Sequence, residues 1–310
     1  MQMLKWFVGA IALLAVACGE VSETSTPVLR DGEGLVELPL VSTSAGRSYK
    51  LVGATFAITG PQNTSVTDTS AETVSVPLIA GAYSIQLNEG WHVERTDAPG
   101  VTVPVTLVSP NPMTFTLGEG ETRPVRFLFK VPEDGTANVG IGVDTGGWIS
   151  GTIQFEPYVG PLPADPPDYF AELRGKSVPF VINFESATVT RVDEYWSKRV
   201  LVETGPITFQ FGGAPSAVLQ QFASALRGLP LYFTLEGGSQ GAGWVPMIHL
   251  QHPSGSFMMD LEVSRALVEV DSEGFPLMTP FSFNESNLTF IRQFMGNASG
   301  TVNNGTFSPR

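Results

Sequence analysis

Apolar and polar residues alternate in short runs through the first half of the chain, a pattern typical of strands that bury one face. In Tyr83–Leu87 the alternation is regular, and the run stops at the turn signal Asn88-Glu89-Gly90. Pro39 interrupts the first run and cannot donate to a ladder, so we expect that run at a sheet edge. Many short strands separated by turns predict an antiparallel β-sandwich. The runs are Leu35–Leu40, Thr55–Ile58, Thr73–Val76, Tyr83–Leu87, Val101–Val108, Met113–Leu117 and Val125–Val131.

The second half continues this alternation and adds one helical pattern. Apolar residues between Val218 and Leu226 recur at helical spacing, and Gly228 is well placed to end a helix near 215–227. A second short helix is expected at Asp168–Arg174. The predicted fold class is mainly β, an N-terminal antiparallel sandwich followed by a β-rich domain with one or two short helices. Its predicted strands are Val178–Phe184, Ala187–Val192, Arg199–Glu203, Ile207–Phe211, Leu231–Leu235, Pro246–Leu250, Phe257–Val263 and Ala266–Val270.

Proline content and polarity divide the chain into segments. Residues 149–168 are rich in proline, which prevents regular helix, and they form the predicted boundary. The sandwich is predicted at 35–148 and the second domain at 169–296. High polarity near the C-terminus predicts a flexible tail at 297–310.

The first residues read as an export signal. Lys5 precedes an apolar run at Trp6–Val16, and small residues lead into Cys18. This run is too short to span about 30 Å of hydrocarbon, which needs about 20 helical residues. A basic start, a short apolar core and small residues at the end predict a signal peptide at residues 1–17.

The end of this segment resembles a bacterial lipoprotein signal, in which the cysteine is acylated and becomes the new N-terminus. The resemblance implies that Cys18 carries a palmitate-containing lipid that holds the protein on a membrane. Gly19-Glu20 lacks the Asp that marks inner-membrane retention in the best-known systems, which implies the outer membrane and leaves its periplasmic or surface face open. Ordinary cleavage near Ala17, which leaves a free thiol, is the alternative. Residues 18–34 hold few large apolar side chains and predict a flexible tether.

Two segments, Gly53–Ile58 and Val76–Leu87, resemble the prealbumin-like sandwich across about residues 48–131. This group includes the Cna B-type repeats of surface proteins and the regulatory-like domains beside carboxypeptidases. In pilin versions a Lys on an early strand bonds an Asn on a late strand. Lys50 lies near the first position, but Val125–Val131 contains no Asn, so no isopeptide crosslink is expected.

Charge and cysteine content narrow the function classes. The formal net charge is −13 and no basic cluster occurs, which makes nucleic acid a poor partner. The chain has one cysteine, so stability must come from packed cores rather than disulfides within the chain. We expect no cofactor.

One motif suggests hydrolysis. Residues 237–241 match the G-x-S-x-G pattern, in which Ser239 would stand on a strand-to-helix turn. The following segment, Ala242–Pro246, is unsuited to begin that helix, and His249 is too close in sequence to be the usual late histidine. A Gly-rich hairpin loop is the favoured interpretation.

Two groups of residues are weak metal candidates, and we expect no metal at either. His249 and His252 have a spacing that could suit zinc if they converge with a nearby carboxylate. Asp271 and Glu273 could offer oxygens to calcium, although their spacing is not the helix–loop–helix signature. Solvated turns and surface histidines are the simpler interpretations.

Trp91 and Trp244 lie near glycines and are candidates for stacking on sugars, although a large aromatic in a sandwich is more often a core residue. Together these features predict a cell-envelope lipoprotein with a non-catalytic binding or scaffolding role. Its partner would be an envelope protein or polysaccharide. The alternatives are an envelope-polymer hydrolase with its site in the C-terminal half, and a purely structural surface module. A pocket that joins Ser239 to a histidine and a carboxylate would favour the enzyme, and an exposed apolar patch would favour binding.

Overall fold

A computed structural model describes residues 27–44, 47–131, 147–158, 168–184, 186–194, 197–237, 242–245, 247–263 and 267–309. Strands make up 59% and helices 5%, which confirms the mainly β fold class. Cys18, Ser239, residues 18–26 of the predicted tether and residues 159–167 of the predicted Pro-rich boundary lie outside the described residues. No helix within the described residues is long and apolar enough to cross a membrane.

The first-half strands are β1 (Glu33–Pro39), β2 (Val41–Ser44), β3 (Arg47–Val52), β4 (Phe56–Thr59), β5 (Thr64–Val66), β6 (Thr73–Ile79), β7 (Gly81–Leu87), β8 (His92–Arg95), β9 (Ala98–Val103), β10 (Thr106–Leu107), β11 (Met113–Leu117), β12 (Thr122–Pro124) and β13 (Phe129–Lys130). The second-half elements are β14 (Gly147–Phe155), the 3₁₀ helix η1 (Ala171–Leu173), β15 (Ser177–Phe184), β16 (Ala187–Glu194), β17 (Ser197–Thr204), β18 (Ile207–Gly212), α1 (Ala217–Leu226), β19 (Tyr232–Gly237), β20 (Ala242–Trp244), β21 (Ile248–Gln251), β22 (Phe257–Glu262), β23 (Leu267–Glu269), β24 (Phe281–Phe283), β25 (Ser286–Arg292) and β26 (Gly296–Ser308).

The first half is β-rich and compatible with the predicted sandwich. One sheet has the strand order β12-β1-β6, and another segment of sheet has the order β5-β4-β7-β11. Side chains from both, including Val36, Phe56 and Tyr83, share one buried apolar cluster. The ring of Tyr83 stacks on that of Phe115 with 5.6 Å between centroids. The two sheets therefore pack face to face, while β2-β3-β8-β9 form a further sheet.

The prediction of β1 as an edge strand is wrong, because β1 lies between β12 and β6. Pro39 is accommodated at its end. β12 pairs with Leu35–Glu37, so Pro39 stands beyond the reach of β12 and pairs with Thr73 of β6. A missing backbone donor is tolerated at the end of a strand.

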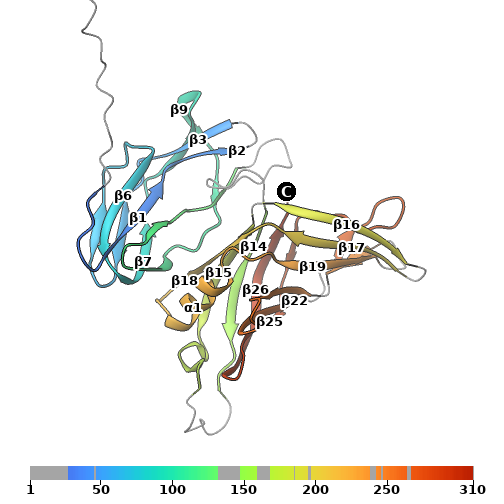
Figure 1. Cartoon of the computed structure of the whole chain (residues 1–310). Coiled ribbons are helices and arrows are strands. Elements are labelled where there is room, and N and C mark those ends of the chain that lie inside the picture. Colours follow the sequence, from blue (N-terminus) through green and yellow to red (C-terminus); the bar gives the residue numbers. More distant parts are fainter. Residues whose placement is uncertain are drawn as a thin grey trace, which may run out of the picture.

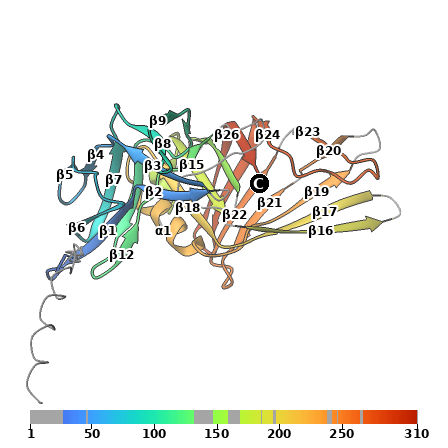
Figure 2. The same cartoon turned by 90° about the horizontal axis from the view of Figure 1, so that it is seen from above.

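A single continuous sheet joins the two halves of the molecule. Met113 and Thr114 of β11 pair with Gly212 and Phe211 of β18. From β18 the sheet continues through β15, β14, β26, β25, β22, β21, β19 and β17 to β16. Figure 1 shows this sheet curving through the second half, and Figure 2 shows β16 and β17 extending away from the first half.

Helix α1 covers the inner, core-facing side of the second-half sheet. Ser216 caps it, since its Oγ accepts a hydrogen bond from the backbone N of Leu219 at 3.1 Å. Phe222 then packs edge-on against Phe257 and Phe290, each with a centroid distance of 5.0 Å. The helix predicted near 215–227 is confirmed, and the shorter helix predicted at Asp168–Arg174 is present in part as η1.

The predicted flexible tail at 297–310 is wrong, because most of it belongs to β26. β26 has 13 residues and lies between β14 and β25, and its Ala298, Val302 and Phe307 are buried in the core. Polar residues of β26 alternate with these small or apolar ones. The composition of the segment is therefore polar, although its core-facing side is packed.

Candidate functional site

Over β17, β19, β20 and β21, strand periodicity gives the second-half sheet one face that points away from its apolar core. Along β19, Phe233 and Leu235 are buried in the core, so Tyr232 and Glu236 point to the opposite side. We call this opposite side the outer face. Helix α1 and the large apolar core occupy the inner face.

Exposed apolar side chains gather on the outer face. Twelve large hydrophobic side chains of the described residues are exposed, and five of them lie on β17, β19, β20, β23 and the segment before β21. Scattered exposed hydrophobics need no explanation, but a contiguous group marks an interaction surface. We call these five residues the outer patch: Leu201 (40% exposed), Tyr232 (46%), Trp244 (42%), Met247 (41%) and Leu267 (73%).

Strand register brings the outer patch together from distant parts of the sequence. Leu201 lies opposite Thr234, two residues along β19 from Tyr232. Trp244 lies opposite Glu236 of the same strand and also opposite Leu267 of β23. Met247 lies two residues before His249, which is opposite Tyr232. The side chains therefore occupy neighbouring positions on adjacent strands.

A row of polar side chains crosses the same face. Glu203, Tyr232, His249 and Asp260 occupy directly opposed positions on β17, β19, β21 and β22. The Tyr232 hydroxyl donates to Glu203 Oε1 at 3.2 Å, and His249 Nδ1 lies 2.5 Å from Asp260 Oδ1. An ionised carboxylate only accepts, so Nδ1 of His249 carries the proton in this pair.

The environment of Tyr232 keeps its phenol neutral. Desolvation raises the pKa of Tyr232, and the hydrogen-bonded carboxylate of Glu203 raises it further. The hydroxyl therefore remains a donor across the physiological pH range. Together with the His249–Asp260 pair, this gives one edge of the outer patch a fixed pattern of donors and acceptors.

Carboxylates surround the outer patch. Glu203, Glu262 and Glu269 are exposed and Glu236 is half-buried; these four form what we call the acidic rim. Within the described residues none of the four forms an ion pair with Lys or Arg. Arg199, the cross-strand neighbour of Glu236, instead pairs with Glu194. The face therefore carries a net negative charge beside its apolar centre.

The predicted histidine group does not assemble. His249 meets Asp260, but His252 lies after β21 and its Nδ1 is 2.7 Å from Ser254 Oγ. Among the described residues no group of three His, Cys, Asp or Glu side chains converges as metal ligands would.

The predicted turn acids are engaged by protein groups. Asp271 accepts hydrogen bonds from the backbone N of Glu273 and Phe275, both at 2.9 Å, and pairs with Arg191 at 2.9 Å. Burial would raise the pKa of Asp271, but these backbone donors and Arg191 outweigh it and lower the pKa. Glu273 also faces Arg191, at 3.4 Å. These oxygens are organised by a turn and a guanidinium.

The strands that flank Ser239 pair directly with each other. Gly237 of β19 lies opposite Gly243 of β20 in an antiparallel pair. Gly237 is five residues along β19 from Tyr232, the residue opposite His249, a separation of about 16 Å.

The two tryptophans proposed for stacking differ. Trp91 packs edge-on against Phe129 at 4.9 Å and belongs to the first-half core, whereas Trp244 is exposed in the outer patch. Sequence reasoning missed Leu201, Tyr232, Met247 and Leu267, because their proximity depends on strand register rather than on local pattern.

A separate cavity of about 500 Å³ lies in the first half, lined in part by Lys50, Glu94 and Arg95. Its charged groups already have partners. Lys50 Nζ donates to the Ser70 carbonyl at 2.8 Å, Arg95 pairs with Asp97, and Glu94 accepts from the Gly100 backbone N at 2.8 Å. The cavity therefore offers few free groups to a ligand.

Comparisons with protein-family models, with curated proteins and with solved structures find no match for this chain.

Proposed function

We propose that this chain is an exported, lipid-anchored binding protein of the bacterial cell envelope. In this proposal Cys18 carries the lipid, the outer membrane is the site of attachment, and the outer patch recognises a partner. The first half, whose sequence resembles a prealbumin-like sandwich, serves as the scaffold between the anchor and the binding face.

The gathering of five exposed apolar side chains on one sheet face carries this proposal. Tyr and Trp are enriched among the residues that dominate binding energy at protein interfaces, and Met is enriched there as well. A polar row with defined hydrogen bonds borders them. An apolar centre beside polar groups is the usual anatomy of a recognition surface.

The junction between the halves supports the scaffolding part. Gln220 Nε2 donates to Thr114 Oγ1 at 2.9 Å, and Thr114 Oγ1 donates to the Phe211 carbonyl at 3.1 Å. Thr114 and Gln220 are both buried. Paired strands and buried hydrogen bonds favour a fixed orientation of the binding face on its scaffold.

Photocrosslinking in living cells tests the binding role. A benzophenone amino acid replaces Met247 in the outer patch or, as the control, Val101, which is 60% exposed on β9. We expect a discrete crosslinked adduct from position 247 and none from position 101. Equal labelling from both positions, or none from position 247, would contradict a binding role for the outer patch.

Metabolic labelling with a palmitate analogue tests the anchor. Cys18 is the sole cysteine, so Cys18→Ala is expected to abolish labelling and to release the protein from the membrane fraction. Label that persists in Cys18→Ala would place the lipid elsewhere and remove this part of the proposal.

Hydrolysis of an envelope polymer is a second candidate, favoured by the His249–Asp260 pair. An imidazole oriented by a carboxylate is the arrangement of a general base. Turnover of purified cell-wall fragments by the intact chain, abolished by His249→Ala, would replace binding with catalysis.

A further inference from the structure

On the basis of the proposed function, we infer that the outer patch binds a cationic amphipathic polypeptide segment.

The apolar centre has the dimensions of a short peptide segment. Tyr232 and Glu236 are four residues apart on β19, a distance of about 13 Å. Leu201 lies on one side of this strand, and Trp244 with Leu267 lies on the other. Three of the five side chains are aliphatic. Aliphatic side chains fit the apolar face of a polypeptide and give a sugar ring no stacking platform.

The acidic rim determines which sign of charge the partner must carry. A neutral or acidic partner that covered Glu203, Glu236 or Glu262 would strip water from the carboxylate without supplying a counter-charge. Lys and Arg side chains would supply that charge. Tyr232 and Trp244 are both partly exposed, and their aromatic rings are of the type that attracts such cations.

Nearby Lys and Arg side chains do not neutralise the carboxylates of the acidic rim. Lys198 pairs with Asp193, and Arg199 pairs with Glu194. Arg191 pairs with Asp271 and Glu273. Each of these three cations is thus already matched by a carboxylate outside the acidic rim, so a positive partner meets a net negative surface.

Binding of three probes to the purified chain tests the inference. The probes are a short amphipathic peptide of Lys and Leu, its Glu and Leu counterpart with the same apolar pattern, and a neutral chitin oligosaccharide. We expect the basic peptide to bind, the acidic peptide to bind at least about tenfold more weakly, and added salt to weaken the complex. Preferential binding of the acidic peptide or the oligosaccharide overturns the inference.

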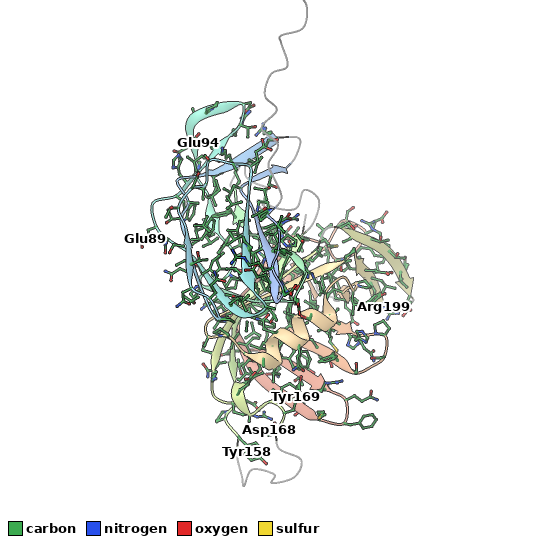
Figure 3. All side chains as sticks on the ribbon, turned by 60° about the vertical axis from the view of Figure 1, so that its left-hand side comes forward. Glu89, Glu94, Tyr158, Asp168, Tyr169 and Arg199 are labelled. Carbon is green, nitrogen blue, oxygen red and sulfur yellow. The ribbon has the colours of Figure 1, made fainter. Side chains whose placement is uncertain are left out.

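Charge variants locate the site. Glu236→Gln combined with Glu262→Gln is expected to weaken binding of the basic peptide about tenfold. The matched control, Glu72→Gln with Glu89→Gln, removes the same charge from exposed positions of the first half and is expected to change little. Figure 3 shows Glu89 on the first half, away from Arg199 beside the outer patch. If both double variants weakened peptide binding equally, net charge alone would explain the effect, and the assignment of the site to the outer patch would be overturned.

Apolar variants test the centre of the site. Trp244→Ala and Met247→Ser are each expected to weaken binding of the basic peptide. Val101→Ser, on the first half, is the control and is expected to leave this binding unchanged. All three side chains are exposed, so the fold is retained, and circular dichroism checks this. A crosslinked adduct at position 247 without basic-peptide binding leaves the proposed function intact and refutes this inference. If neither a crosslinked adduct at position 247 nor binding of the basic peptide is seen, both the proposed function and this inference are refuted.

Discussion

At the scale of single residues, one partly buried ion pair ties a loop to the C-terminal strand. Asp168 is 8% exposed, pairs with Arg174 Nε at 2.9 Å and accepts from the Phe170 backbone N at 2.9 Å. Arg174 also donates to the carbonyl of Asn297 at 2.8 Å. The bond with Arg174 lowers the pKa of Asp168, partly offset by burial. This stabilisation is therefore complete above the unfolded-state pKa of about 3.9 and is lost as pH falls through the lower folded-state pKa.

Asp168→Asn is expected to lower the free energy of unfolding by about 1–3 kcal/mol at neutral pH, since Arg174 loses its carboxylate partner. The difference from the parent chain should narrow as pH falls below about 4, where the Asp168 carboxyl of the unfolded parent becomes protonated, and should vanish below the lower folded-state pKa. Urea denaturation across this pH range measures both effects. Asp97→Asn is the control, because its pair with Arg95 is exposed and contributes little. A neutral-pH stability equal to that of the parent would contradict the assignment.

At the scale of elements, glycines in β26 serve close packing. A Cβ added at Gly300 would lie 2.8 Å from the Gln154 carbonyl oxygen, and one added at Gly305 would collide with the Phe283 ring. β14 and β24, which pair with β26, therefore approach it more closely than a side chain would permit. Glycines are typical of loops in a sequence, but in β26 they allow a central strand to fit between its neighbours.

Gly305→Ala is expected to destabilise the fold by about 1–3 kcal/mol, because the methyl group must displace a packed aromatic ring. Thermal unfolding measures the change. In the control, Gly118→Ala, the nearest atom is Oε2 of Glu121 at 3.1 Å, which is the far end of a flexible side chain rather than a packed ring, so a smaller loss is expected. Equal losses in the two variants would show that the general effect of replacing glycine, rather than the Phe283 contact, determines the loss.

Sequence periodicity located most elements but not their partners. β11 spans the predicted Met113–Leu117, and α1 lies within the predicted helical range. Alternation is a local signal, so it identifies such elements well. The strand β26 was not predicted because several of its buried positions hold small residues, such as Ala298 and Gly300, within a polar sequence. The outer patch was not predicted because strand register joins Leu201 to strands much later in the chain. Trp244 was recognisable by type, but its neighbours were not.

At the scale of the whole molecule, buried polar contacts couple the two halves. Thr114 belongs to the first half and Gln220 to α1, and their hydrogen bond lies beside the β11–β18 pair. Salt bridging adds a weaker contact, with 3.8 Å between Arg227 Nη1 and Glu121 Oε1. We therefore expect the two halves to unfold together.

A double-mutant cycle checks this coupling. Thr114→Val leaves the Gln220 amide buried without its partner and is expected to cost about 1–3 kcal/mol. Adding Gln220→Leu should recover part of that loss, because two apolar groups replace the hydrogen-bonded pair. Urea unfolding measures the four stabilities. Strictly additive losses, or separate transitions for the two halves, would contradict the coupling.

The position of β26 also orders the assembly of the molecule in time. Ribosomes deliver a chain from its N-terminus, so β14 emerges long before β26, its neighbour in the finished sheet. Until the last residues arrive, β14 and β25 keep an unpaired edge and the core above them stays incomplete. Unpaired edges and slow long-range closure expose a nascent chain to aggregation. We therefore expect the sheet of the second half to close late in folding, once β26 is available to pair with β14 and β25.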